Sequence, residues 1–169
     1  MKKAIDWLFN PPTSGESTII LLRLMAGGVF FWEGILKFVY VNQGLGRFTK
    51  LGFPAPEFTA NFVATTEIFG GLLLLFGLFT RFAALWFIAE MIVAILSTKI
   101  SLFLGTSPLP LPPAPPKTGI WAVLHEIRAD YAQVMICIFL LVEGAGQLSL
   151  DAAWKRKKPA FDTAQVAIS

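Results

Sequence analysis

Ionisable side chains occur inside stretches of this sequence that are otherwise almost wholly apolar. Their positions are Arg23, Glu33, Lys37, Glu67, Glu90 and Glu143. A carboxyl group can take up and release a proton, and a cationic side chain can polarise a carbonyl or hold an anion. Glu67 and Glu90 are therefore the candidate catalytic residues, which would exchange protons. The candidate ligand-binding residues are Arg23, Glu33 and Lys37, whereas Glu143 is predicted to be interfacial.

The content of histidine and cysteine limits the redox and metal chemistry of this chain. His125 and Cys137 are each the sole residue of their type. A lone thiol cannot form an intrachain disulfide or a four-thiolate cluster, and a lone imidazole cannot supply bis-histidine ligation to haem. We therefore expect no metal site and no covalently bound cofactor, so electrons would reside on a bound molecule or on a partner protein.

The elements that must position these side chains are membrane-spanning helices. Of the 169 residues, 55% are hydrophobic and 15% are charged, whereas a soluble domain is about 45–50% apolar and about 25% charged. Four stretches suit the ~20 residues that cross a bilayer: residues 18–40, 58–79, 82–102, and a helix that begins at the interface near residue 121 and crosses over 131–148. The sequence predicts an all-α integral membrane protein, a four-helix bundle with antiparallel up-down topology.

The same pattern divides the chain into three parts. Residues 1–17 are predicted to form an interfacial segment, with a short amphipathic helix lying on the membrane. Residues 18–151 are predicted to form the four-helix transmembrane domain. Residues 152–169 are predicted to form a basic, partly disordered cytoplasmic tail.

Basic residues and connections predict the orientation. The block Lys155–Lys158, just beyond the last span, is typical of a cytoplasmic segment in contact with anionic lipid, and not of nucleic-acid binding. Four spans then place both termini in the cytoplasm. A very short turn at Thr80-Arg81 would lie on the same side and make the second and third spans antiparallel neighbours. The proline-rich residues 108–116 predict a stiff, extended outer loop.

Helical geometry predicts that the ionisable residues meet inside the bundle. At about 100° per residue, Glu33 and Lys37 lie one turn apart on the first span, and Arg23 falls within about 80° of both. Arg23, Glu33 and Lys37 therefore form one polar stripe along the first span. Glu67 and Glu90 lie at similar depths on adjacent spans, so we expect them to face this stripe. We also expect Arg23 to pair with a buried acid. The glycines that would allow close approach of the backbones are Gly27, Gly28, Gly70 and Gly71.

Two interpretations of these charges remain open. They are either structural ion pairs that fix which helix faces which, or the lining of a polar pocket that binds a ligand or carries protons.

Short motifs spread along the chain resemble one membrane protein family. They are Leu22-Arg23-Leu24, Trp32-Glu33-Gly34-Ile35-Leu36-Lys37-Phe38, Leu51-Gly52-Phe53-Pro54-Ala55-Pro56, Glu67-Ile68-Phe69-Gly70-Gly71, Leu78-Phe79-Thr80-Arg81 and Ser149-Leu150-Asp151. Their order and spacing resemble the DoxX family of small bacterial four-helix membrane proteins. The family pattern often has His or a small residue where this chain has Glu33.

The resemblance implies a redox context in the bacterial cytoplasmic (inner) membrane. Relatives are named for components of thiosulfate:quinone oxidoreductase and terminal quinol oxidase, and others associate with thiol and superoxide defence proteins. The expected cofactor is accordingly a bound quinone. Besides the lipid bilayer, the expected partners are other membrane subunits or a redox partner protein.

The leading hypothesis is that the chain is a membrane subunit of a redox or quinone-linked assembly. Any catalytic activity would then be that of an oxidoreductase component that acts together with partner proteins. In this hypothesis Glu67 and Glu90 exchange protons, while Arg23 or Lys37 polarises a bound carbonyl or anion. One alternative is a non-catalytic scaffold or assembly subunit whose charges only lock helix packing. Another is a small-solute or proton transporter, which would need to oligomerise.

Overall fold

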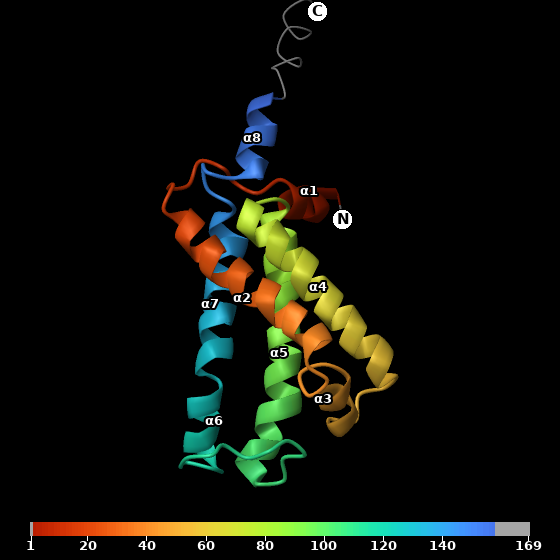
Figure 1. The fold of residues 1–169 in the computed structure, drawn as a ribbon. Coiled ribbons are helices and arrows are strands. Elements are labelled where there is room, and N and C mark those ends of the chain that lie inside the picture. The colour runs from red at the N-terminus through yellow and green to blue at the C-terminus, as the bar shows by residue number, and fades with distance from the viewer. Residues whose placement is uncertain (1, 158–169) are drawn as a thin grey trace, which may run out of the picture.

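The computed structural model describes residues 2–157, and within them every regular element is an α-helix. The helices in chain order are α1 (Lys2–Phe9), α2 (Ile19–Val39), α3 (Leu45–Lys50), α4 (Pro56–Phe76), α5 (Thr80–Leu104), α6 (Ile120–Glu126), α7 (Arg128–Glu143) and α8 (Leu150–Lys157). Figure 1 shows α2, α4, α5 and α7 as the long rods of the molecule. The prediction of an all-α protein is confirmed for the described part of the chain.

Three of the predicted spans are confirmed as helices long and apolar enough to cross a membrane, namely α2, α4 and α5. Helices α2 and α4 have 21 residues each and α5 has 25. At about 1.5 Å per residue, 21 residues reach about 31 Å, close to the ~30 Å hydrocarbon core of a bilayer. All three bury only a minority of their residues inside the protein, which leaves broad apolar surfaces for lipid.

The region predicted as a single fourth helix consists of two helices. Helix α6 has 7 residues and α7 has 16, and they meet at Ile127. The backbone hydrogen bonds continue across this junction, because Ile127 donates to the carbonyl of Val123 and accepts from Tyr131. Figure 1 accordingly shows α6 and α7 nearly end to end beside α5.

The long helices alternate in direction. Figure 1 shows the starts of α2 and α5 and the ends of α4 and α7 at one end of the molecule, together with α1 and α8. Helix α3 and residues 105–119 lie at the opposite end. As the proline content predicts, residues 105–119 contain no helix.

One prediction about the ends of elements is wrong. The tight turn consists of residues 77–79, not Thr80-Arg81, because Gly77 adopts the left-handed conformation (φ 64°) that ends α4, and Thr80 already begins α5. The first residues of the predicted tail, 152–157, belong to α8. Lys158 and the rest of the predicted tail lie outside the described residues.

Close helix contacts hold α2 against α4. A Cβ added at Gly27 would lie 2.8 Å from the carbonyl oxygen of Gly71, and one at Gly34 would lie 2.7 Å from that of Ala64. The predicted role of Gly27 and Gly71 is therefore confirmed, and Gly34 is a further contact of this kind. Gly28 does not serve an interface, since its added Cβ would meet only Trp32 of its own helix, at 3.4 Å.

Helix α5 packs on α7, and an aromatic stack joins this pair to the α2–α4 pair. The rings of Phe30 and Phe87 are parallel, with centroids 3.6 Å apart, and both side chains are buried. Gly70 makes room for the stack, because a Cβ there would lie 2.6 Å from the Phe87 ring. The molecule thus consists of two helix pairs joined across a buried seam.

Candidate functional site

An ion pair in the α2–α4 interface is the centre of the candidate site. Lys37 Nζ on α2 lies 2.5 Å from Glu67 Oε2 on α4, and the side chains are 13% and 4% exposed. The close approach at Gly34, one turn before Lys37, brings the two backbones together next to this pair. A pair this buried is costly to break, since removing one partner leaves an uncompensated charge in an apolar medium.

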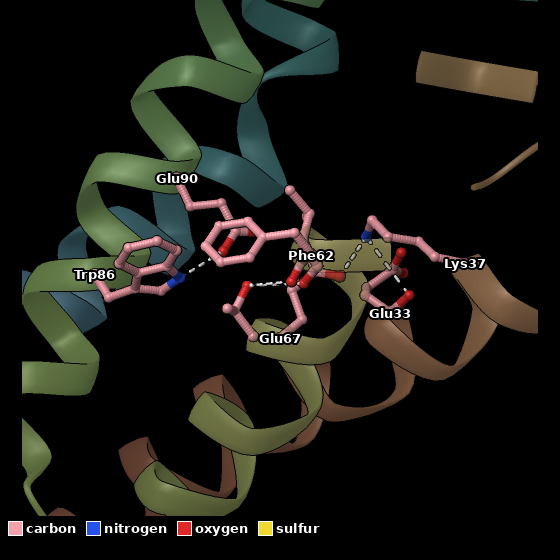
Figure 2. A network of polar contacts seen from close by, with 8 residues as sticks. Glu33, Lys37, Phe62, Glu67, Trp86 and Glu90 are labelled. Atoms are coloured by element: carbon pink, nitrogen blue, oxygen red, sulfur yellow. Dashed lines mark hydrogen bonds and ion pairs between the residues drawn. The ribbon is translucent and has the colours of Figure 1, made fainter. Parts of the chain in front are cut away.

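A second acid extends the ion pair toward α5. Glu90 of α5 lies close to Glu67, and its Oε2 accepts a hydrogen bond of 3.2 Å from Trp86 Nε1. Figure 2 shows these side chains converging from three helices. Lys37, Glu67, Glu90 and Trp86 are called the central cluster below. It crosses the seam between the two helix pairs, and it contains two carboxyl groups but one ammonium group.

Glu33 lies at the edge of the central cluster. Its backbone carbonyl is 3.5 Å from Lys37 Nζ, and Figure 2 shows it beside Lys37 on the same helix. Its side chain is half-buried and makes no ion pair within 4.0 Å in the described part of the chain. The predicted convergence of Glu33, Lys37, Glu67 and Glu90 is thus present in the structure.

Arg23, by contrast, does not belong to the central cluster. It precedes Glu33 by about 15 Å along α2 at 1.5 Å per residue, and it is 2% exposed. Its guanidinium donates hydrogen bonds to four backbone carbonyls, those of Leu74 (3.0 Å) and Leu75 (2.7 Å) in the last turn of α4 and those of Ala145 (3.0 Å) and Leu148 (2.5 Å) between α7 and α8. The expectation that Arg23 pairs with a buried acid is therefore wrong. The last carbonyls of a helix lack intrahelical partners, and a buried guanidinium with five donors satisfies several at once.

Further polar contacts lock the same end of the molecule. Asp151 caps the start of α5, where its carboxylate accepts from the backbone N–H groups of Phe79 (3.0 Å) and Thr80 (3.3 Å) and from the Thr80 hydroxyl (3.2 Å). Arg81 donates to the carbonyls of Leu141 and Val142, both at 2.8 Å. Three of the motifs behind the family resemblance, those around Arg23, Arg81 and Asp151, thus form structural contacts between helix ends.

Sequence reasoning missed two polar residues in the interior. Trp86 precedes Glu90 by one helical turn, a spacing that could have indicated the pair. Gln133 on α7 is 7% exposed, and its Oε1 has no hydrogen-bond partner among the described residues. The sequence feature that could have indicated Gln133 is a single amide side chain within an otherwise apolar segment. Gln133 also lies one turn before buried Cys137, whose surroundings include Glu90.

The remaining candidates are peripheral. Glu143 at the end of α7 and His125 on α6 are exposed. Within residues 2–157, no three histidine, cysteine, aspartate or glutamate side chains are grouped in a way that could hold a metal ion.

Comparison with known proteins agrees with this arrangement of membrane helices. The family model described as DoxX matches residues 18–100. The uncharacterized membrane protein Rv3486 of Mycobacterium tuberculosis is 38% identical over 152 residues, covering 86% of each chain. A Bacillus subtilis protein named "Putative oxidoreductase CatD" is 30% identical over 147 residues, covering 86% of this chain and 93% of its own. No solved structure matches the chain. With these similarities along most of its length, the chain belongs to the DoxX family of membrane proteins.

Proposed function

We propose that this protein is the membrane subunit of a quinone-linked redox assembly in which the central cluster exchanges protons with a bound quinone. The observation that carries the proposal is the buried group of Lys37, Glu67 and Glu90, two carboxyl groups around one ammonium group at the seam between helix pairs. Ionisable groups inside a membrane are costly and usually serve transport, proton relay or ligand binding. The relative named as an oxidoreductase supports a redox role.

The charges of the cluster suit proton exchange. With both carboxyl groups ionised, the cluster would carry one net negative charge in a medium of low dielectric constant, and binding one proton neutralises it. The proton can reside on Glu90, where the carboxyl group would donate a hydrogen bond to Glu67 while Trp86 holds its other oxygen. Glu67 would stay ionised beside Lys37.

The donors and acceptors of the site fit a quinone. A quinone supplies two-electron, two-proton redox chemistry at its ring carbonyls. Lys37 can donate to such a carbonyl, and the unpartnered Oε1 of buried Gln133 can accept a hydrogen bond from a hydroxyl of the reduced quinol. The aromatic rings of Phe62 and Trp86, with centroids 5.7 Å apart, form the apolar wall in front of Glu90 (Figure 2).

In the membrane, we infer four crossings. Joined end to end, α6 and α7 are long enough to cross the ~30 Å core at about 1.5 Å per residue, and they would complete an antiparallel four-helix bundle. The ends of the chain carry Lys2, Lys3, Lys155 and Arg156 on the side of α1 and α8. Because positively charged segments stay in the cytoplasm, both termini would be cytoplasmic in a bacterial inner membrane.

The test replaces each proposed proton-exchanging carboxyl group by an amide of nearly the same shape. Glu67→Gln and Glu90→Gln retain hydrogen bonding but cannot release a proton, so quinone-dependent oxidation in isolated membranes should fall at least about 100-fold in each. Glu57→Gln is the matched control, since Glu57 is exposed in the first turn of α4. Protein abundance is measured in parallel.

A non-catalytic assembly subunit is the second candidate, supported by the contacts of Arg23, Arg81 and Asp151, in which charged side chains of this chain bind backbone groups of other helices. Full activity of both glutamine variants at normal abundance would contradict proton exchange and favour the assembly role.

A further inference from the structure

A cavity of about 470 Å³ lies at the end of the molecule opposite the termini. It is enclosed by the segment after α2, by α3, by the last turns of α5 and by the proline-rich loop, which Figure 1 shows together at that end. Cavities of about 300–1,000 Å³ are typical of small-molecule sites. The volume is much larger than a single ordered water requires.

The charged side chains that line the cavity are mostly cationic. It contains Arg47 and Lys50 from α3 and Lys99 from α5, and its sole acid is Glu126. Lys99 Nζ is 3.9 Å from Glu126 Oε2, too far for a hydrogen bond. Arg47 and Lys50 have no carboxylate within 4.0 Å in the described part of the chain. Even with Asp130, which lies close to Arg47 and Lys99 outside the lining, three cations face two carboxylates.

The rest of the wall is mixed. Leu102 of α5 and residues 109–113 of the loop, three of which are prolines, contribute apolar surface, and Asn42, Gln43, Thr98 and Ser107 contribute polar side chains. Proline has a fixed φ, so the loop part of the wall loses little conformational freedom when a ligand binds. A ligand complementary to the cavity therefore combines an oxyanion with an apolar body.

We propose that this cavity binds the phosphate group of an amphiphilic anion, with Arg47 and Lys50 as its main ligands. The Arg47 guanidinium donates no hydrogen bond to an acceptor within the described residues and has no carboxylate within 4.0 Å there, so it is free to hold two oxygens of one phosphate. The same chemistry suits the headgroup of an anionic phospholipid at the membrane surface and a soluble phosphate compound. This site is distinct from the central cluster and does not depend on redox activity.

The experiment follows melting of the purified full-length protein in a neutral detergent as ligand is added. Dihexanoylphosphatidylglycerol is the anionic probe, dihexanoylphosphatidylcholine is the zwitterionic control with the same chains, and inorganic phosphate is the soluble probe. We expect saturable stabilisation by the anionic lipid and none by the zwitterionic lipid. The half-saturating concentration should rise at least about tenfold in Arg47→Gln/Lys50→Gln, since hydrogen bonds between charged groups are individually strong.

Two further variants keep the result interpretable. Lys50→Gln alone removes an exposed side chain that forms no ion pair within the described residues, so it should fold normally and still weaken binding. Lys117→Gln removes an exposed loop cation outside the cavity lining and should bind like the unmodified protein. Equal stabilisation by inorganic phosphate, with the same sensitivity to Lys50→Gln, would assign the site to soluble phosphate compounds. Absence of saturable stabilisation by either anion, or equal binding in all variants, would overturn the proposal.

Discussion

At the scale of single residues, the charged groups within the long helices divide into two roles. Lys37 pairs with Glu67 near the centre of the molecule, with Glu90 close by, whereas Arg23 donates hydrogen bonds to backbone carbonyls at one end. The difference lies in the partners. Two carboxyl groups beside one ammonium group can bind a proton, because the proton neutralises their excess negative charge. A guanidinium surrounded by carbonyls instead satisfies backbone acceptors, and no titratable group among the described residues is in contact with it.

The structural role of Arg23 leads to a stability prediction. Arg23→Ala would leave the carbonyls of Leu75, Ala145 and Leu148 without the donor that Arg23 provides, and an unsatisfied buried group costs about 1–3 kcal/mol. The carbonyl of Leu74 would keep the backbone N–H group of Gly77. We expect the free energy of unfolding in detergent to fall by at least about 3 kcal/mol, as measured by denaturant titration. Arg128→Ala is the control, because Arg128 is exposed and bonds only the nearby carbonyl of His125. Equal stability of the two variants would contradict the anchoring role.

At the scale of elements, the approach of α2 to α4 decides whether Lys37 can reach Glu67. The two backbones are in contact at Gly27–Gly71 and at Gly34–Ala64, and in a membrane such contacts between small residues replace the hydrophobic driving force that lipid cannot provide. The ion pair lies beside the second of these contacts. A methyl group added at these contacts would therefore move Lys37 away from Glu67 as well as lower the stability of the protein.

Adjacent glycines on α2 allow a matched test of this packing. A Cβ at Gly27 meets backbone atoms of α4 within 2.8–2.9 Å, whereas a Cβ at Gly28 meets only the flexible Trp32 side chain. Gly27→Ala should therefore lower the melting temperature clearly. Gly28→Ala should leave it unchanged or raise it, since alanine is favoured over glycine within a helix by about 0.5–1 kcal/mol. If the two substitutions had the same effect, the close contact of α2 and α4 would not determine stability.

At the scale of the whole molecule, the antiparallel arrangement separates two chemically different ends. One end carries α1, α8 and the anchoring contacts of Arg23, Arg81 and Asp151. The other carries α3, the proline-rich loop and the cationic cavity. The central cluster lies between them, since Glu67 and Glu90 are near the middle of α4 and of α5. A protein that crosses the membrane four times would present these two ends to opposite aqueous phases.

This arrangement predicts the outcome of topology mapping. A reporter fused to the C-terminus should report the cytoplasm, and one inserted after Pro113 in the outer loop should report the opposite side, because basic segments remain cytoplasmic. Alkaline phosphatase and green fluorescent protein fusions together would give opposite signals at the two positions. Finding both positions on one side would exclude a fourth crossing by α6 and α7.

The sequence by itself determined the class of the protein and most of its helices. Apolar length fixes α2, α4 and α5, because any backbone inside a membrane must satisfy its own hydrogen bonds. Prolines exclude a helix from residues 108–116 for the same reason, since they lack the donor. The convergence of Lys37, Glu67 and Glu90 also followed from the sequence, through helical periodicity and the high cost of an isolated buried charge.

The partner of each charged side chain depends on the tertiary structure. Periodicity placed Arg23 on the same face of the first span as Glu33 and Lys37, yet it could not show that carbonyls from the last turn of α4 and from the α7–α8 connection surround it. Likewise, the cap that Asp151 forms on α5 joins positions 71 and 72 residues apart. Contacts of this kind depend on where helix ends meet in space. Local sequence patterns carry helical phase and hydrophobicity, but the meeting of distant helix ends is set by the packing of the whole chain.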